Sequence, residues 1–184
     1  MAKVLLVDTN FASAPIYSVL KGFGYTVHVI GSNPNDTLAK SAEQYWNIDY
    51  SDTAALSDLI EKEAFDYLVP GCTDRSYKSC AIVSQGRFPG IESPDIEHGM
   101  HNKEKFKAIA EELNIPIPET QNHNSKSLDY PVIIKPVDSF SGRGITVIKN
   151  RNKRLLDSAI ELARKNSATE EYLLEKFVSG ELYS

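Results

Sequence analysis

Over the first 85 residues, short apolar segments alternate with segments that have the periodicity of amphipathic helices. The segment at 3–7 is an almost continuous apolar run, which is typical of a strand buried on both faces of a parallel sheet. Further strands are predicted at 26–30, 45–48 and 66–69, and helices at 13–23, 34–42, 51–63 and 73–85. Because short connections join these alternating elements, the sequence predicts a Rossmann-like α/β parallel sheet.

The order of the elements changes in the second half of the chain. Strands are predicted at 131–135, 145–149 and 172–178, and helices at 103–113 and 152–165. Strand pairs that flank a loop and a single helix indicate a small α+β domain. The intervening segment at 86–99 is rich in proline and glycine and is predicted to be a connection, which gives two domains, 1–97 and 98–184.

The helix predicted at 103–113 has a regular apolar face. Phe106, Ile109, Ala110 and Leu113 recur at helical spacing, and we expect all four to be buried. Asn102 stands where a helix cap is expected, and prolines at 116 and 118 require an extended chain after the helix.

Composition excludes several classes of protein. The chain has 20 basic and 25 acidic residues, so a nucleic-acid binder with a broadly basic surface is not expected. No apolar run approaches the ~20 residues of a membrane helix, and the N-terminus lacks the apolar core of a signal peptide. Two cysteines, Cys72 and Cys80, are too few for a disulfide framework. We therefore expect a cytoplasmic protein without nucleic-acid or membrane partners.

The acidic charge is concentrated in the first domain. Residues 1–97 contain 7 basic and 13 acidic residues, whereas residues 98–184 contain 13 basic and 12 acidic residues. A polyanion such as a nucleotide is therefore repelled less by the second domain than by the first.

The first predicted domain offers few candidate site residues. The loop after the first strand has no glycine, which argues against the close backbone approach that a dinucleotide pyrophosphate requires. Thr73 and Asp74 follow the strand at 66–69, where open α/β sheets bind ligands, so they are candidate substrate-binding residues; helix capping is the alternative. His28 is expected on the surface of its strand, Ser13 is expected to cap a helix, and the histidines suggest no metal site.

The second domain carries several weak signals for an anionic ligand. The loop at 138–144, between two strands, has glycines whose N–H groups could surround phosphate oxygens, although an ordinary hairpin is an equal alternative. Lys135 precedes this loop, and the alternative is a lysine at the edge of the sheet. Lys103 stands in the first turn of a helix, where its positive charge interacts unfavourably with the helix dipole, and a ligand phosphate could offset that cost. Glu175 by itself suggests a solvated strand end.

The order of these signals is more specific than any one of them. The succession is Asn102-Lys103-x-x-Phe106, Ile115-Pro-Ile-Pro118, Tyr130-Pro-Val-Ile-Ile-Lys135-Pro136, Ser139-Phe-Ser-Gly-Arg-Gly-Ile145 and Leu174-Glu-Lys-Phe-Val-Ser-Gly180. It resembles the ATP-grasp superfamily in the style of biotin carboxylase and carbamoyl phosphate synthase. Residues 1–97 resemble the Rossmann-like domain that precedes the grasp in those enzymes. The second domain would then be the small α+β N-terminal subdomain of an ATP-grasp fold.

The resemblance implies a set of ATP-binding residues. Lys103 and Lys135 would contact phosphates, and the glycine loop would close over the β- and γ-phosphates. Glu175 and Lys176 would border the adenine, with the backbone of 176–178 at its edge. Glu181 is the candidate ribose ligand, although the family commonly places that glutamate where this chain has Leu182. The complete set is Lys103, Lys135, Ser139, Ser141, Gly142, Arg143, Gly144, Glu175, Lys176, Phe177, Val178 and Glu181.

The resemblance also implies an activity. A full-length enzyme of this kind uses ATP and Mg²⁺ to phosphorylate a small-molecule carboxylate, and an amine or thiol then displaces phosphate from the acyl phosphate. The metal-binding and catalytic residues of the family belong to a C-terminal half. We therefore interpret this chain as an N-terminal part that is inactive alone and that could form a homodimer.

Two other classes of function stay open at this stage. One alternative is a non-catalytic module that binds a nucleotide or another ligand. A nucleotide-cofactor oxidoreductase built on the first domain is a third hypothesis, which the missing glycines oppose.

Overall fold

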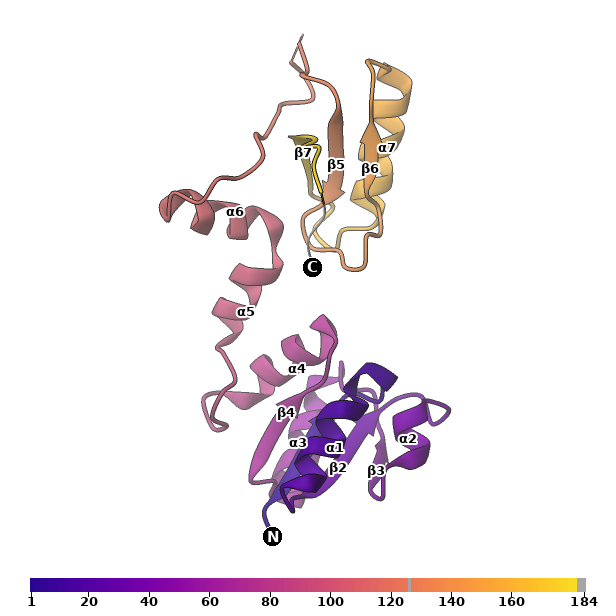
Figure 1. Ribbon diagram of the computed structural model, residues 1–184, viewed down its shortest axis with the longest axis vertical. Coiled ribbons are helices and arrows are strands. Elements are labelled where there is room, and N and C mark those ends of the chain that lie inside the picture. Colours follow the sequence, from indigo (N-terminus) through magenta and orange to yellow (C-terminus); the bar gives the residue numbers. More distant parts are fainter. Residues whose placement is uncertain (126, 182–184) are drawn as a thin grey trace. The chain divides into compact units, whose positions relative to one another are not determined.

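The computed structural model describes residues 1–125 and 127–181, and the chain divides into two compact units, Met1–His98 and Gly99–Ser184 (Figure 1). Leu182, where the family pattern expects a ribose ligand, lies outside the described residues. No helix among the described residues is long and apolar enough to cross a membrane.

The first unit is built on four parallel strands. They are β1 (Lys3–Val7), β2 (Thr26–Gly31), β3 (Tyr45–Asn47) and β4 (Tyr67–Pro70), in the order β3-β2-β1-β4. Strand β1 is central because it pairs with β2 on one side and with β4 on the other. Its side chains enter two separate clusters, with Leu5 and Val7 in one and Leu6 in the other. The predicted parallel α/β sheet, with its apolar central strand, is confirmed.

Helices connect these strands, and one more follows β4. They are a 3-10 turn η1 (Phe11–Ser13), α1 (Ala14–Gly22), α2 (Thr37–Ser41), α3 (Thr53–Glu63) and α4 (Asp74–Ser84). Side-chain caps begin three of them: the Asn10 side chain accepts a hydrogen bond from the N–H of Ala12, the Asp52 carboxylate accepts one from the N–H of Ala55, and the Thr73 hydroxyl accepts one from the N–H of Ser76. The capping interpretation of Thr73 is confirmed. Ser13 makes no such cap, so that expectation was wrong.

The segment predicted to be only a connection contains the start of a helix. Helix α5 (Pro94–His101) begins at the second proline of this segment. The first turn of a helix tolerates a proline because the missing N–H is not needed there. The proline-rich composition therefore marked a helix start as well as a boundary.

The second unit holds an antiparallel sheet. Its strands are β5 (Val132–Pro136), β6 (Thr146–Ile148) and β7 (Tyr172–Lys176), in the order β6-β5-β7. Helix α7 (Lys153–Lys165) lies along one face of this sheet (Figure 1) and packs through Leu156, Ala159, Ile160 and Ala163. Val132, Ile134, Ile148 and Leu174 meet it from the strands. The other face of the sheet carries both charged and apolar side chains, among them Lys135, Glu175 and Leu173.

Helix α6 (Lys103–Glu112) departs from the expected burial. Only Ala110 of its apolar face is buried, whereas Phe106 is 43% exposed, Ile109 38% and Leu113 65%. An amphipathic pattern shows that a face can be buried but not which surface covers it. The prediction that all four residues are buried was wrong.

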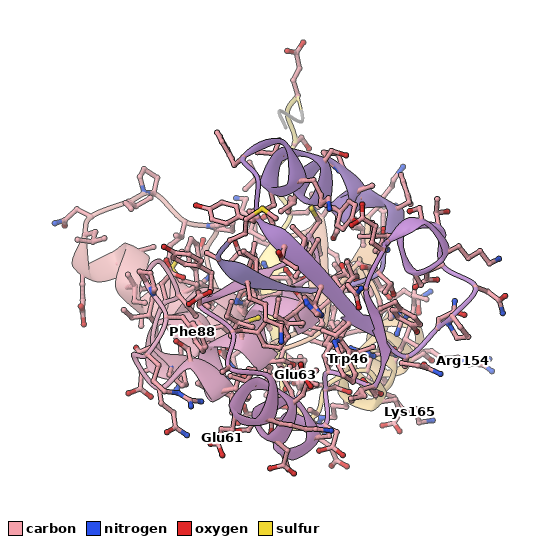
Figure 2. All side chains as sticks on the ribbon, turned by 90° about the horizontal axis from the view of Figure 1, so that it is seen from below. Trp46, Glu61, Glu63, Phe88, Arg154 and Lys165 are labelled. Atoms are coloured by element: carbon pink, nitrogen blue, oxygen red, sulfur yellow. The ribbon has the colours of Figure 1, made fainter. Side chains whose placement is uncertain are left out.

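His28 is also placed differently from its prediction. It is buried in β2, although an exposed position was expected, because Phe65 packs edge-on against its ring and Trp46 covers it from the neighbouring strand. The indole N–H of Trp46, which is labelled in Figure 2, donates to Nδ1 of His28 over 3.2 Å. Burial, followed by the positive charge of Lys3, lowers the pKa of His28. The imidazole is therefore held neutral.

We expect acidification to weaken the first unit through His28. A depressed folded-state pKa means that stability is complete above the unfolded pKa of about 6.5 and falls as the pH drops through that value toward the folded pKa. Protonation at Nδ1 removes the bond to Trp46, which costs about 1 kcal/mol. Urea unfolding followed by the fluorescence of Trp46, the single tryptophan, measures this loss. A His28→Gln control should lose the pH dependence in this window, and equal slopes in both proteins would contradict the assignment.

Candidate functional site

A buried carboxylate lies at the centre of the candidate site in the second unit. Glu175 on β7 is only 1% exposed, so the interpretation of a solvated strand end was wrong. Its strand is covered on both edges, by β5 on one side and by a bridge from Thr120 on the other. Sequence alone did not show the second covering segment, which comes from the irregular stretch before β5.

Two lysines neutralise this carboxylate. Nζ of Lys107 lies 2.6 Å from Oε1 of Glu175, and Nζ of Lys135 lies 2.5 Å from Oε2. The strand register explains the second contact: Lys135 pairs with Leu173, so Glu175 is its diagonal neighbour on the face opposite α7. Lys135 therefore occupies the central strand, and the alternative of a lysine at the sheet edge was wrong.

Lys107 is a site residue that the motif analysis did not identify. It follows Lys103 by four residues, so the two side chains project from the same face of α6 one turn apart. That spacing was visible in the sequence as a second lysine one turn after Lys103 on the motif helix. Its carboxylate partner was not visible, because Glu175 is distant in the chain.

These charged groups line a pocket of about 230 Å³. One part of its wall is apolar and consists of Met100, Phe106, Ile117 and Pro118. The other part carries Lys103, Lys107, Lys135 and Glu175. Three ammonium groups against one carboxylate leave the pocket positively charged, which suits an anionic ligand with a flat apolar portion. Phe106 is exposed on α6 because it forms part of this wall.

Lys103 joins the pocket to the glycine loop. Its Nζ donates to the carbonyl oxygen of Ser139 over 2.8 Å, and its backbone N–H donates to the carbonyl oxygen of Val137 over 2.8 Å. The Asn102 side chain caps the helix by accepting from the N–H groups of Glu104 and Lys105. The first turn of α6 is therefore fixed against the chain that leaves β5.

The loop at 139–144 turns sharply through left-handed backbone conformations. Ser141, Gly142 and Gly144 have φ values of 56°, 72° and 74°. Gly144 is required at its position, because a Cβ there would lie 2.8 Å from both Cβ of Asn166 and Cγ of Pro136. Arg143 is exposed, and its N–H donates to the carbonyl oxygen of Phe140. The loop thus places the Ser139 carbonyl beside Lys103 and continues into a tight turn that contains two glycines.

Asp138 anchors the start of this loop. Its carboxylate accepts hydrogen bonds from the N–H groups of Ala168 and Thr169, at 3.1 and 3.2 Å. Burial by itself would raise the pKa of Asp138, but hydrogen bonds from the Ser167 hydroxyl and from these two N–H groups outweigh it and hold the pKa below its usual value. Asp138 therefore stays ionised and ties the loop to the segment after α7.

The strand end at 176–178 leaves one backbone donor available. The N–H of Lys176 donates to the carbonyl oxygen of Glu119, and the N–H of Phe177 donates to that of Pro131. Within residues 1–125 and 127–181, the N–H of Val178 has no hydrogen-bond partner. The Lys176 ammonium is paired with Asp129, and Glu181 is exposed beyond the strand. Residues 176–178 were expected to contact the base through their backbone. Of their three N–H groups, that of Val178 is therefore the one that remains available within the described residues.

The candidate substrate residues lie in the first unit. The Thr73 hydroxyl caps α4 and lies 3.4 Å from the Tyr50 hydroxyl, while Asp74 is exposed in the first turn of that helix. Arg75 beside them stacks over the Tyr50 ring and pairs with Asp49 over 3.0 Å. These groups lie at the carboxyl end of β4, beside the point where the strand order reverses.

A buried hydrogen-bond network at this edge was not expected from sequence. The hydroxyl of Ser13 donates to Oδ2 of Asp8 over 3.1 Å and accepts from the N–H of Cys72 over 3.0 Å. Gly71 permits this approach, because a Cβ there would lie 2.3 Å from Cβ of Asp8. Ser13 therefore ties the ends of β1 and β4 together, which is why it does not cap α1.

We expect Gly144→Ala to destabilise the second unit more than Gly142→Ala. Both glycines have positive φ, which costs alanine about 1 kcal/mol. Only at position 144 does the added Cβ also collide with neighbours, which adds about 2 kcal/mol. Chemical denaturation of both variants measures the difference. Equal losses of stability would show that the packing around Gly144 does not constrain the loop.

Comparisons with known proteins fit this geometry. Residues 100–181 match the family described as carbamoyl-phosphate synthase L chain, ATP binding domain. The formate-dependent phosphoribosylglycinamide formyltransferase of Histophilus somni (strain 129Pt) is 25% identical over 159 residues, which cover 82% of this chain and 40% of that protein. The arginine-specific carbamoyl phosphate synthase large chain of Bacillus subtilis (strain 168) is 25% identical over 181 residues, which cover 88% of this chain and 17% of that protein. The chain thus spans less than half the length of these relatives.

Solved structures show the same fold. The biotin carboxylase domain dimer of Hydrogenobacter thermophilus 2-oxoglutarate carboxylase, in complex with MgADP, ADP and bicarbonate, has a TM-score of 0.77 at 20% identity over 96% of this chain and 44% of that chain. The N5-carboxyaminoimidazole synthetase of Staphylococcus aureus, complexed with ADP, has a TM-score of 0.75 at 16% identity over 96% of this chain and 48% of that chain. The ATP-grasp resemblance indicated by the motifs is confirmed: residues 100–181 match the ATP-binding domain of the carbamoyl-phosphate synthase L chain, and the solved structures share the fold.

Proposed function

We propose that the pocket in the second unit binds ATP. The observation that carries this proposal is the buried Glu175 carboxylate with its lysines, in a pocket whose opposite wall is apolar. Lys103 and Lys135 would contact the phosphates, since a point-like ammonium suits a phosphate oxygen. The apolar wall formed by Phe106 and its neighbours would receive the flat face of the base.

The loop and the strand end supply the remaining contacts in this proposal. Ser139, Ser141, Gly142, Arg143 and Gly144 would surround the terminal phosphates, because the loop begins at the Ser139 carbonyl beside Lys103 and its tight turn exposes backbone at two glycines. The open N–H of Val178 would donate to the edge of the base, next to Lys176 and Phe177. Glu181 is the proposed ribose ligand.

We propose that the whole protein is an ATP-dependent carboxylate–amine or carboxylate–thiol ligase. ATP would supply the phosphoryl group that converts a small-molecule carboxylate into an acyl phosphate, which the amine or thiol then attacks. This chain would bind and orient the nucleotide. Thr73 and Asp74 would contact the acceptor substrate from the first unit.

Magnesium enters the proposal with the nucleotide. Among residues 1–125 and 127–181, no group of three or more His, Cys, Asp or Glu side chains could hold a metal ion. We assign none of these residues to Mg²⁺, which would enter the site bound to the phosphates of the nucleotide. The proposal includes a cytoplasmic location, a homodimer, and no turnover by the 184-residue chain alone.

A non-catalytic nucleotide-binding module is the alternative. The described part of the chain supports binding equally in both cases, so the two hypotheses differ in what the native polypeptide adds. The intact mass of the polypeptide made by its own cells distinguishes them. A product about as long as the relatives supports the ligase, whereas a product of 184 residues supports the module.

We expect Lys135→Ala to weaken ATP binding by roughly tenfold or more, because a charge-assisted contact to phosphate is lost. Lys107 still neutralises Glu175 in this variant, so the fold should persist. Isothermal titration of the 184-residue chain with MgATP measures the effect. Lys149→Ala, an exposed lysine at the end of β6, is the matched control. Unchanged affinity in Lys135→Ala, or no ATP binding by the wild-type chain, would contradict the proposal.

A further inference from the structure

The two lysines on Glu175 are held in different ways. Lys107 is 12% exposed and fully engaged: its ammonium donates to Oε1 of Glu175 over 2.6 Å and to the carbonyl oxygen of Pro118 over 2.7 Å. Lys135 is 22% exposed, and its ammonium approaches Oε2 outside hydrogen-bonding geometry. Within the described residues Lys135 has no second partner. Lys135 is therefore the more easily released of the two.

A buried carboxylate limits how far either lysine can move. Removing the last cation from a buried carboxylate leaves an uncompensated charge, which is strongly unfavourable. With Lys107 in place, Lys135 can leave and Glu175 still has a hydrogen-bonded cation. Without Lys107, Lys135 would have to stay.

We propose that Lys107 is a positioning residue that makes Lys135 available to a nucleoside polyphosphate. Lys107 holds the charge of Glu175, so that Lys135 can turn from Oε2 toward the phosphates. The departure of Lys135 also leaves Oε2 as a buried acceptor facing the pocket, open to a donor on the ligand. This role in phosphate binding rests on the proposed function, whereas the control of Lys135 by Lys107 can be tested without a nucleotide.

The test measures how fast an amine-acylating reagent modifies Lys135 in the complete 184-residue chain, with sites quantified by peptide mass spectrometry. An ammonium held against a carboxylate reacts slowly, because only the free amine is acylated. In the wild-type chain we expect Lys135 to react faster than Lys107. In Lys107→Met, Glu175 has Lys135 as its remaining lysine, and we expect acylation of Lys135 to fall about tenfold.

Two further variants separate this role from a purely structural one. In Lys107→Met/Glu175→Gln the neutral amide no longer retains Lys135, so the rate should recover to the wild-type value or above. Lys107→Arg keeps the charge and should stay near the wild-type rate. Lys105→Met, on the exposed side of the same helix, is the matched control and should not change the rate. Wild-type reactivity of Lys135 in Lys107→Met, or no recovery in the double variant, would overturn the proposal.

The single variant Glu175→Gln keeps the proposal testable if Lys107→Met does not fold, as judged by circular dichroism. It retains both lysines and should increase the acylation of Lys135; an unchanged rate would overturn the proposal. Protection by MgATP is measured in the same assay. If the acylation rates of Lys135 change with the variants as expected but MgATP gives no protection, the proposed function is contradicted and the control by Lys107 stands. If MgATP protects Lys135 but the acylation rate does not depend on Lys107, the proposed nucleotide binding stands and the control of Lys135 by Lys107 is overturned.

Discussion

The buried ion pairs of Glu175 organise the second unit around one point. A carboxylate that is 1% exposed is tolerated only with cations and hydrogen bonds close to it. Lys135 comes from the adjacent strand and Lys107 from α6, so the requirement joins β5, β7 and α6, which are separate in sequence. The same three elements also line the pocket, so the contact that neutralises the charge also shapes the site.

The glycine loop depends on this arrangement through α6. The first residue of that helix holds the loop by two hydrogen bonds, one from its backbone and one from its ammonium. Asp138, also at the start of the loop, is bonded to the segment after α7. Because both anchors lie at the start of the loop, its tip at 141–144 is attached mainly by its own turn and by the close packing at Gly144.

Local patterns predicted much of this structure. The apolar run at 3–7 predicted a strand buried on both faces of a parallel sheet, because such burial leaves a signature within the strand itself. The order of the motifs identified Lys103, Lys135 and Glu175, and the structure brings these three residues to one pocket. Periodicity and motif order are properties of short segments, and they were sufficient for the main candidates and for most elements, although not for α5.

Properties that depend on distant neighbours were missed. Glu175 is buried because the segment around Thr120 covers an edge that the sequence leaves open. His28 is buried by Trp46 and Phe65, and Ser13 bonds to Asp8 and Cys72 instead of capping its helix. Phe106 was expected in the core because an amphipathic helix does not show whether its apolar face meets protein or a ligand pocket. In each case a contact with a residue or ligand distant in the sequence determines the burial or the hydrogen bonding, and a single sequence does not identify that contact.

The central claim is that the pocket between α6, β5 and β7 is a nucleotide site. An amide-resolved NMR titration of the 184-residue chain with MgADP tests it most directly, because each backbone N–H reports its own surroundings. The account expects the largest shifts at Val178 and at Gly142 and Gly144, with little change at Cys72 and Thr73 in the first unit. Shifts confined to the carboxyl edge of the parallel sheet, or no shifts at all, would contradict it.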